Sequence, residues 1–526
     1  SGLNSVAFDL GGGSDFFGKT KAVAVWKEAL SDQELADLTY PTPTFPTFTL
    51  DFNTIAEQFT FARGSEATYV DAQGLIQSTN VLGSELVLNG NFSNGNANWN
   101  LGAGWSISGG IATLDGTQIG SSGLGSSTMS VTSGKTYKVV VNVISKSSGF
   151  RLYDNNGVVA YGLNVGENVF YRTVTSSTYQ VTPLGLSGAT GSIDNVSVKE
   201  HITATNTPRL DYSTGAEAFL LEPQSTNLLT YSEEFDNSAA WYLGNTSVVS
   251  NSVISPDGNL TADKVTFNAV ANANIQRNAV PTVISGLDYT FSFYAKSDSN
   301  VSNVNIDMGT GDESIAVTNE WQRFTRTVTA SGTTIPTTLV TRNSISSYIY
   351  IFGAQLEQKS YATSYIPSEG SQTTRNQETC INATPEINSE EGVLYADISA
   401  LANDGTYRNI CLSDGSLTNR ILAQYTPTAN QINIIIVYSG GQYSLSHTVS
   451  NVTSNKKIAF KWNTNGSALW VNGVQVDTST SGFLPIGLNT LSFDNTIGDN
   501  FFGNTKDLQI YTKALSDAEL IKLTTI

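Results

Sequence analysis

Aromatic side chains near glycines are the residues of this sequence best suited to hold a ligand. An aromatic ring stacks on the apolar C–H face of a sugar, while neighbouring Asn, Asp and Gln side chains bond the sugar hydroxyls. Trp105, Tyr153 and Tyr161 lie beside glycines in expected loops, and Tyr242 is a further candidate. We expect these four rings to be exposed carbohydrate-binding platforms. Core packing is the alternative for each of them.

Acid–base chemistry has few candidates. Only two histidines occur, His201 and His447, and a Ser-His-Asp or Cys-His site would need one of them. Neighbouring residues on a strand point to opposite faces, so the glutamates at 233–234 and 390–391 are expected to be solvated surface charges. We therefore predict no catalytic residues and no enzyme. A polysaccharide depolymerase remains an alternative, because any two of the acidic residues could meet in the fold.

The two cysteines leave two possibilities open. A bridge between Cys380 and Cys411 would close a loop of about 30 residues and contribute roughly 3 kcal/mol to stability. In a reducing compartment the same residues would be two buried free thiols.

The composition restricts the class of protein. At roughly 150 residues per domain, 526 residues make three or four domains. The formal net charge of −18 would repel phosphates, so we expect no nucleic-acid partner. No apolar run approaches 18 residues, so we expect no membrane insertion. The content of 10% aromatic residues, together with abundant Ser, Thr, Asn and Gly, favours an all-β, turn-rich fold.

An internal repeat joins the two ends of the chain. Residues 2–39 align without a gap on residues 487–524, and about half of the positions are identical. Both copies predict two strands followed by a short helix. In the second copy Ser516 and Glu519 form a capping box, with Leu515 and Leu520 at the positions of a hydrophobic staple. We expect each copy to close a domain with this capped helix.

Two further units with the same order of landmarks occupy the middle of the chain. The first contains NGNFSNGNANW and SIDNVSV, and the second contains YSEEFDNSAAWY and YIFGAQLE. Trp99 and Trp241 follow a phenylalanine at matched positions in the two units, so we expect both in the core. Alternating strands dominate each unit, which predicts two antiparallel β-sandwiches.

Several motifs resemble those of known families. RGSEATYVDAQG, PRLDYS and LLEPQSTNLL, with FGAQLEQKSYATSYIPSEGSQTTR, resemble a connector and the sandwich after it in bacteriophage tail-fibre and virion appendage proteins. The segment with EGVLYADISA, LWVNGVQV and ALSDAEL looks like a laminin-G or concanavalin-A-like domain. NGNFSNG through IDNVSV looks like a carbohydrate-binding-module jelly roll. The fold implied is all-β, a series of tandem jelly rolls.

The jelly-roll resemblance also implies a structural calcium ion between the first and last strands. It places Asn91 and Asp194 at that metal site. Calcium takes six to eight oxygen ligands, and the sequence supplies only these two candidates there. The Asp-rich turn at 494–500 is a weaker calcium candidate.

The repeat and these resemblances together divide the chain. The expected parts are a laminin-G-like C-terminal remnant (1–40), a linker and connector (41–79), an inserted jelly roll (80–201), the second half of the connector (202–228), a second jelly roll (229–375) and a complete laminin-G-like domain (376–526). We expect the remnant to belong to a domain that begins before Ser1.

The resemblance implies a structural protein of the bacteriophage virion. The expected role is a tail fibre or receptor-binding appendage on the virion surface, which recognises host surface polysaccharide or other glycans. Other virion subunits and two further copies of the chain, in a homotrimer, are the implied protein partners. The alternative is a head fibre or decoration protein with a purely structural role.

Overall fold

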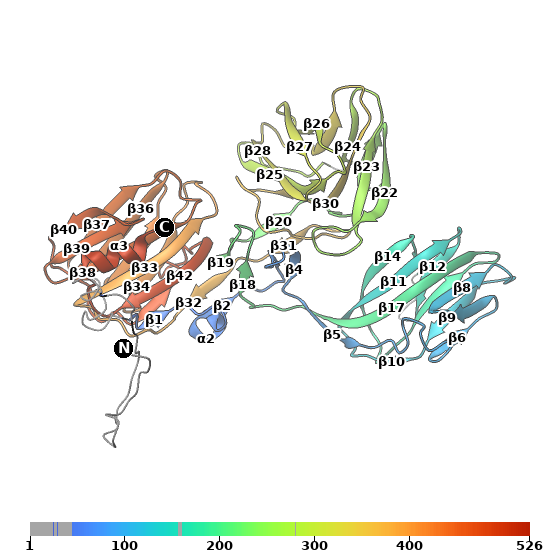
Figure 1. Ribbon diagram of the computed structural model, residues 1–526, viewed down its shortest axis with the longest axis horizontal. Helices are drawn as coiled ribbons and strands as arrows, with labels where there is room; N and C mark the ends of the chain where they lie inside the picture. The colour runs from blue at the N-terminus through green and yellow to red at the C-terminus, as the bar shows by residue number, and fades with distance from the viewer. Residues whose placement is uncertain (1–24, 26–28, 30–44, 156–159, 279) are drawn as a thin grey trace, which may run out of the picture. The chain divides into compact units, whose positions relative to one another are not determined.

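The computed structural model describes residues 45–526 except 156–159 and 279, together with Val25 and Ala29. The all-β prediction is confirmed, because antiparallel strands build three two-layered sandwiches (Figure 1). The expected remnant at 1–40, including the first copy of the capped helix, lies outside the described residues apart from Val25 and Ala29. No helix among the described residues is both long enough and apolar enough to cross a membrane.

The first sandwich is formed by strands β5 to β17. One sheet has the order β14-β11-β17-β8-β7 with β5 paired to β17, and the other has the order β13-β12-β16-β9-β6. The strands are β5 Val81–Glu85, β6 Trp99–Leu101, β7 Trp105–Ser108, β8 Ile111–Asp115, β9 Ser122–Ser126, β11 Thr136–Lys146, β12 Phe150–Asp154, β13 Ala160–Gly162, β14 Gly166–Thr173, β16 Val181–Gly185 and β17 Thr190–Ile202. In β11, Tyr137, Val139, Val141 and Val143 are buried and alternate with more exposed residues, as a strand with one core face requires.

The second sandwich also has two five-stranded sheets. Their orders are β21-β24-β29-β26-β27 and β22-β23-β30-β25-β28. The strands are β21 Trp241–Gly244, β22 Thr246–Val253, β23 Ala262–Phe267, β24 Ala273–Arg277, β25 Asp288–Lys296, β26 Val301–Asp307, β27 Asp312–Val317, β28 Gln322–Thr329, β29 Thr338–Thr341 and β30 Ser347–Glu357. Trp99 and Trp241 lie in the cores of the first and second sandwich, each against the phenylalanine that precedes it, as expected.

The third sandwich is completed by segments from the connector. One sheet has the order β18-β19-β42-β33-β38-β39-β40 with β1 paired to β42, and the other has the order β37-β36-β35-β34-β41. The strands are β1 Phe48–Thr49, β18 Arg209–Asp211, β19 Ala218–Leu221, β33 Glu391–Ala400, β34 Arg408–Ser413, β35 Arg420–Tyr425, β36 Gln431–Tyr438, β37 Gly441–Thr448, β38 Lys456–Asn463, β39 Gly466–Val471, β40 Val474–Ser479, β41 Thr490–Ser492 and β42 Gly503–Tyr511. Phe59 and Phe219 contact Phe493, so the connector shares the core of this sandwich.

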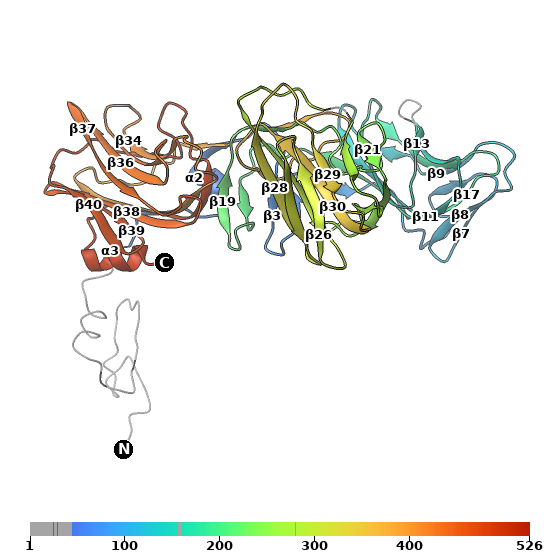
Figure 2. The same ribbon diagram turned by 90° about the horizontal axis from the view of Figure 1, so that it is seen from above.

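The capped helix of the second repeat copy is confirmed. Helix α3 (Asp517–Thr524) begins after Ser516, whose hydroxyl accepts from the Glu519 N–H while the Ser516 N–H donates to the Glu519 carboxylate. Leu515 and Leu520 are buried in a small cluster with residues of β38 and β39. Figure 2 shows α3 against the outer face of the sheet that contains these two strands.

The two halves of the connector meet where the first sandwich leaves and rejoins them. The Arg63 N–H donates to the Asn206 side chain, and the Asn206 N–H donates back to the Arg63 carbonyl. The Thr79 hydroxyl donates to the Ala204 carbonyl at 3.4 Å. Two short ladders tie the connector to later segments: β2 (Thr60–Ala62) with β32 (Thr379–Ile381), and β20 (Ser225–Asn227) with β31 (Thr373–Arg375).

Candidate functional site

A groove of about 640 Å³ lies in the second sandwich. Serine and asparagine side chains form most of its wall, together with Arg342, Ile345 and Tyr348. They come from β26, from Ser314 on β27, from the start of β30 and from the loops before β26 and β30. We call this hollow the asparagine groove.

The amides of the groove are held by the sheet and by the loop beside it. The Asn303 Nδ2 donates to the Asn343 Oδ1 at 3.1 Å, and the Asn305 Nδ2 donates to the Val340 carbonyl at 3.2 Å. The Ser314 hydroxyl donates to the Asn305 Oδ1 at 2.6 Å. These bonds fix the orientation of both amides before any ligand arrives.

Ser347 supplies a group with unused hydrogen-bonding capacity. Ser347 is one of the groove residues, and its hydroxyl is shielded from solvent and has no partner among the described residues. A buried polar group normally has a hydrogen-bond partner, and leaving it unpaired costs roughly 1–3 kcal/mol. The polar groups that a ligand in the groove can reach lie on its exposed residues, among them Ser299, Asn300 and Ser302.

Arg342 is neutralised by two carboxylates. Its Nε and Nη2 lie 2.5 and 2.7 Å from the two Asp312 oxygens, and Nη2 also lies 2.9 Å from an Asp307 oxygen. The hydrogen bond to Asp312 raises the pKa of Arg342, and the same bond lowers the pKa of the Asp312 carboxyl. The Arg342 Nη1 donates to the Asn272 Oδ1 at 3.0 Å. The guanidinium therefore serves as a rigid part of the wall.

Tyr348 is the aromatic residue of the groove, and its own partners also fix it. Its hydroxyl and that of Tyr350 both donate to an Asp298 oxygen, at 2.9 and 3.0 Å. The Lys264 ammonium lies 3.9 Å from the centre of the Tyr348 ring. This arrangement follows from strand register, because Lys264 on β23 lies opposite Tyr350 on β30.

Tyr242 lies on the same sheet face as part of the groove wall. The register runs from Tyr242 through Gln276 and Thr338 to Asp307, and residues directly opposite each other share a face. The Tyr242 side chain is half exposed, at 50%. Its role in carbohydrate binding stays a prediction.

The other predicted platforms lie in the first sandwich. Trp105 is a correction: it is 7% exposed in the core, its Nε1 donates to the Ser122 carbonyl, and its ring packs on Phe150. The glycines around it form turns, but the ring itself belongs to the inward face of β7. Tyr153 is partly buried on β12. Tyr161 lies on β13, where it pairs with Leu152 of β12, and its side chain lies outside the described residues.

The predicted calcium residues belong to neighbouring segments. The Val196 N–H donates to the Gly90 carbonyl at 3.0 Å, which brings the loop of Asn91 beside the strand of Asp194. The Asn91 Oδ1 accepts from the Ser93 N–H and hydroxyl. Among the described residues, no three His, Cys, Asp or Glu side chains gather as metal ligands. A calcium ion held with backbone and amide oxygens stays a prediction.

Two other sequence candidates have defined surroundings. The Arg420 Nη1 donates to the Asn495 carbonyl at 2.6 Å, so a cation already contacts the Asp-rich turn at 494–500.

Cys380 and Cys411 are free and buried, so of the two possibilities, a disulfide or two thiols, the structure has the thiols. Burial raises the pKa of both, that of Cys411 to about 12. Neither thiol is a nucleophile at neutral pH.

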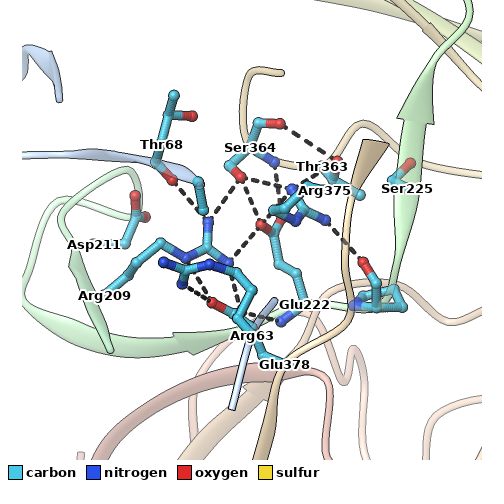
Figure 3. Close-up of polar contacts among 12 residues, drawn as sticks. Arg63, Thr68, Arg209, Asp211, Glu222, Ser225, Thr363, Ser364, Arg375 and Glu378 are labelled. Carbon is cyan, nitrogen blue, oxygen red and sulfur yellow. Dashed lines mark hydrogen bonds and ion pairs between the residues drawn. The ribbon is translucent and has the colours of Figure 1, made fainter. Parts of the chain in front are cut away.

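Sequence reasoning missed a buried cluster in the connector, shown in Figure 3. Arg63, Arg209, Arg375, Glu222 and Glu378 are each at most 2% exposed. The Glu378 carboxylate lies 2.7 Å from the Arg63 Nη1 and 2.5 Å from the Arg209 Nη2. Glu222 lies 2.9 Å from Arg209 and 2.8 Å from Arg375. We call these five residues the arginine–glutamate cluster.

The arginine–glutamate cluster joins segments that are far apart in the sequence. Arg63 follows β2, Arg209 begins β18, Glu222 follows β19, and Arg375 and Glu378 lie between the second and third sandwich. All five residues occur in or beside the motifs quoted above, so the motifs marked the segments. Only the contacts reveal the role, which is to fix the connector against both sandwiches.

Burial and charge act in opposite directions on this cluster. Burial alone would raise the pKa of Glu222, but the charges of Arg375 and Arg209 outweigh it and lower the pKa to about 2. The Ser364 N–H and hydroxyl also donate to the Glu222 carboxylate, at 2.8 and 2.6 Å. Each arginine of the cluster has carboxylate and carbonyl or hydroxyl partners, and the Arg375 Nε is buried without a partner among the described residues.

No family model matches this chain. No curated protein matches it either. Similar solved structures include a CBM40 module of the Ruminococcus gnavus IT-sialidase bound to α2,3-sialyllactose, at 18% identity and a TM-score of 0.24 over 26% of this chain and 84% of that one. A leech intramolecular trans-sialidase has the same identity, score and share of this chain, but only 24% of its own length is aligned. A tandem CBM22 pair from Paenibacillus barcinonensis Xyn10C is 13% identical, with a TM-score of 0.19 over 53% of this chain and 98% of its own. The solved structures that this chain is similar to thus include carbohydrate-binding modules.

Proposed function

We propose that the asparagine groove of the second sandwich binds a glycan. The observation that carries this proposal is a groove lined by serine hydroxyls and asparagine amides, in which the Asn303 and Asn305 amides are already oriented by hydrogen bonds. Sugars present many hydroxyls that both donate and accept hydrogen bonds, and amide and hydroxyl side chains complement them. The half-exposed Tyr242 on the same sheet face would extend the contact to further sugar units.

Binding without catalysis is the form of this proposal that the groove supports. A glycoside hydrolase needs one carboxyl group that can donate a proton and a second one that is free to attack or to activate water. Asp307 and Asp312 are both held by Arg342, and this contact lowers the pKa of Asp312. Neither aspartate is placed to act as a general acid, so a depolymerase is disfavoured at this site.

The biological setting that we propose comes from the sequence resemblance. It is a bacteriophage virion appendage, a tail fibre or receptor-binding protein in which weak sites act together in a homotrimer. Linking several weak sites multiplies their combined affinity. A head fibre or decoration protein is the alternative setting. Labelling of intact virions distinguishes them: a capsid location, with adsorption unchanged by a covering antibody, would reject the tail assignment.

A glycan array with the full chain tests the groove itself. We expect binding that the variant Asn303→Ala weakens by about fivefold, since it removes hydrogen-bonding capacity worth about 1 kcal/mol. Asn319→Ala is the matched control, because Asn319 is exposed in the same sandwich and does not line the groove. Equal binding by all of these proteins, or binding by none, would contradict the proposal.

A further inference from the structure

The charges around the asparagine groove define the class of glycan that fits it. Arg342 is the only charged side chain among the described residues that line the groove. A guanidinium has five N–H donors, and the contacts to Asp307, Asp312 and Asn272 use four of those on Arg342. The groove therefore offers almost no free cationic donor to an anion.

The local charge balance is also unfavourable to an anion. Arg342 contributes one positive charge, and Asp307 and Asp312 contribute two negative charges, so this triad carries a net charge of −1. Asp298 adds a further carboxylate, which accepts from the Tyr348 hydroxyl, and the Lys264 ammonium lies over the Tyr348 ring rather than in the groove lining. A ligand carboxylate in the groove would lie near these acids without a cation of its own.

We infer that the groove takes neutral glycans and discriminates against those that carry sialic or uronic acid. This inference rests on the proposed function and names its substrate class. The discrimination comes from repulsion by Asp307 and Asp312 and from the pairing of four of the five Arg342 donors. Neutral sugars bind through the uncharged Ser and Asn side chains. Salt screens charges and not these hydrogen bonds, so the affinity for neutral sugars changes little with ionic strength.

The experiment is an array that pairs each neutral oligosaccharide with its sialylated and uronate-bearing counterparts, followed by calorimetry on the best pair. We expect the full chain to bind the neutral member at least about tenfold more tightly, the factor that 1.4 kcal/mol of repulsion gives. The variant Asp312→Asn frees the Arg342 Nε and brings the triad to zero charge, so the discrimination should shrink severalfold. Glu320→Gln is the control, since it makes the same change in net charge at an exposed residue outside the groove.

The outcomes separate the inference from the proposed function. Equal or tighter binding of the charged member through the groove would overturn the inference and leave glycan binding in place. Discrimination that Asp312→Asn does not change would also overturn it, because the repulsion would then come from elsewhere. Loss of all groove-dependent binding, neutral and charged, would overturn the proposed function itself.

Discussion

Glu222 and Glu233 are eleven residues apart in the sequence, yet the fold places them in opposite electrostatic surroundings. Glu222 lies between Arg209 and Arg375, and their charges lower its pKa to about 2. Burial, together with the charge of Asp257, raises the pKa of Glu233 to about 8, and the Tyr365 hydroxyl donates to its carboxyl group at 2.6 Å. Nearby Asp263 behaves similarly, since burial raises its pKa to about 7.

The difference between Glu222 and Glu233 shows what decides the protonation state of a buried carboxyl group. Burial penalises the charged form in both places, and only an opposite charge within a few ångströms reverses that penalty. The arginines come from segments 13 and 153 residues away along the chain from Glu222. Arginines from other segments therefore keep Glu222 charged in ion pairs, whereas burial favours the uncharged form of Glu233.

We expect the largest effect from removing the segments that carry Arg63 and Arg209. We expect residues 376–526 alone to fail to fold cooperatively. They would lack Arg63 and Arg209 for Glu378, and also six buried apolar side chains of the shared core: Leu50, Ile55, Phe59, Phe61, Phe219 and Leu221. At about 2 kcal/mol each, these side chains match the whole stability of a domain. Near-ultraviolet circular dichroism and proteolysis would check this, and a sharp thermal transition in the fragment would contradict it.

A single substitution should have the next largest effect. Glu378→Ala leaves Arg63 and Arg209 buried without their shared carboxylate, and we expect a loss of about 3–5 kcal/mol in the free energy of unfolding. Lys461→Ala is the matched control, because Lys461 and Asp517 are also 2.7 Å apart but Asp517 is 64% exposed. That exposed pair should contribute no more than about 1 kcal/mol. Equal losses from the two variants, measured by urea unfolding, would show that the cluster is not special.

The pH dependence of stability sharpens the comparison. A carboxyl group with a raised pKa in the folded state binds more protons there than in the unfolded chain. Stability from Glu233 and Asp263 is thus present below their ordinary pKa and falls as pH rises from about 4 to about 8. The slope is at most about 1.4 kcal/mol per pH unit for each group. Glu222 acts in the opposite sense, and its contribution is lost as pH falls from about 4.5 toward 2.

Two variants separate the contributions of Glu233 and Glu222 to the pH dependence of stability. Glu233→Gln should flatten the decline between pH 5 and 8 by up to about 1 kcal/mol per pH unit, a value reduced by the partial exposure of this side chain. Glu222→Gln should instead reduce the loss below pH 4. Urea midpoints measured from pH 3 to pH 9 would test both. A Glu233→Gln profile parallel to that of the unchanged protein would contradict the assignment.

The smallest effect is expected from removing the first sandwich. The Thr79 hydroxyl contacts the Ala204 carbonyl, so a short Gly-Ser link can replace residues 80–203 without moving the connector. We expect the arginine–glutamate cluster to persist, and the unfolding transition of the remaining chain to shift by less than about 1 kcal/mol. Loss of the Glu378→Ala effect in this shortened chain would show that the first sandwich helps to hold the cluster together.

Local sequence patterns predicted the elements that depend on neighbours in the chain. The capping box at Ser516 and the burial of Trp99 and Trp241 are confirmed. Each rests on residues a few positions apart, where strand and helix periodicity bring side chains together. Trp105 shows the limit of this reasoning, since flanking glycines indicated a loop but could not tell which face of the next strand its ring occupies.

The candidate site depended on contacts between distant segments. The asparagine groove combines β26 with residues near β30, about 40 positions later, and no motif marks it. The arginine–glutamate cluster lies in motifs that were visible, but its pairs span up to 315 residues. The sequence by itself determined the β-rich fold and the cap of the last helix, because backbone periodicity and capping are local. The tertiary structure alone decided which acids meet an arginine and which amides line a groove, because burial and charge pairing depend on what the rest of the chain brings alongside.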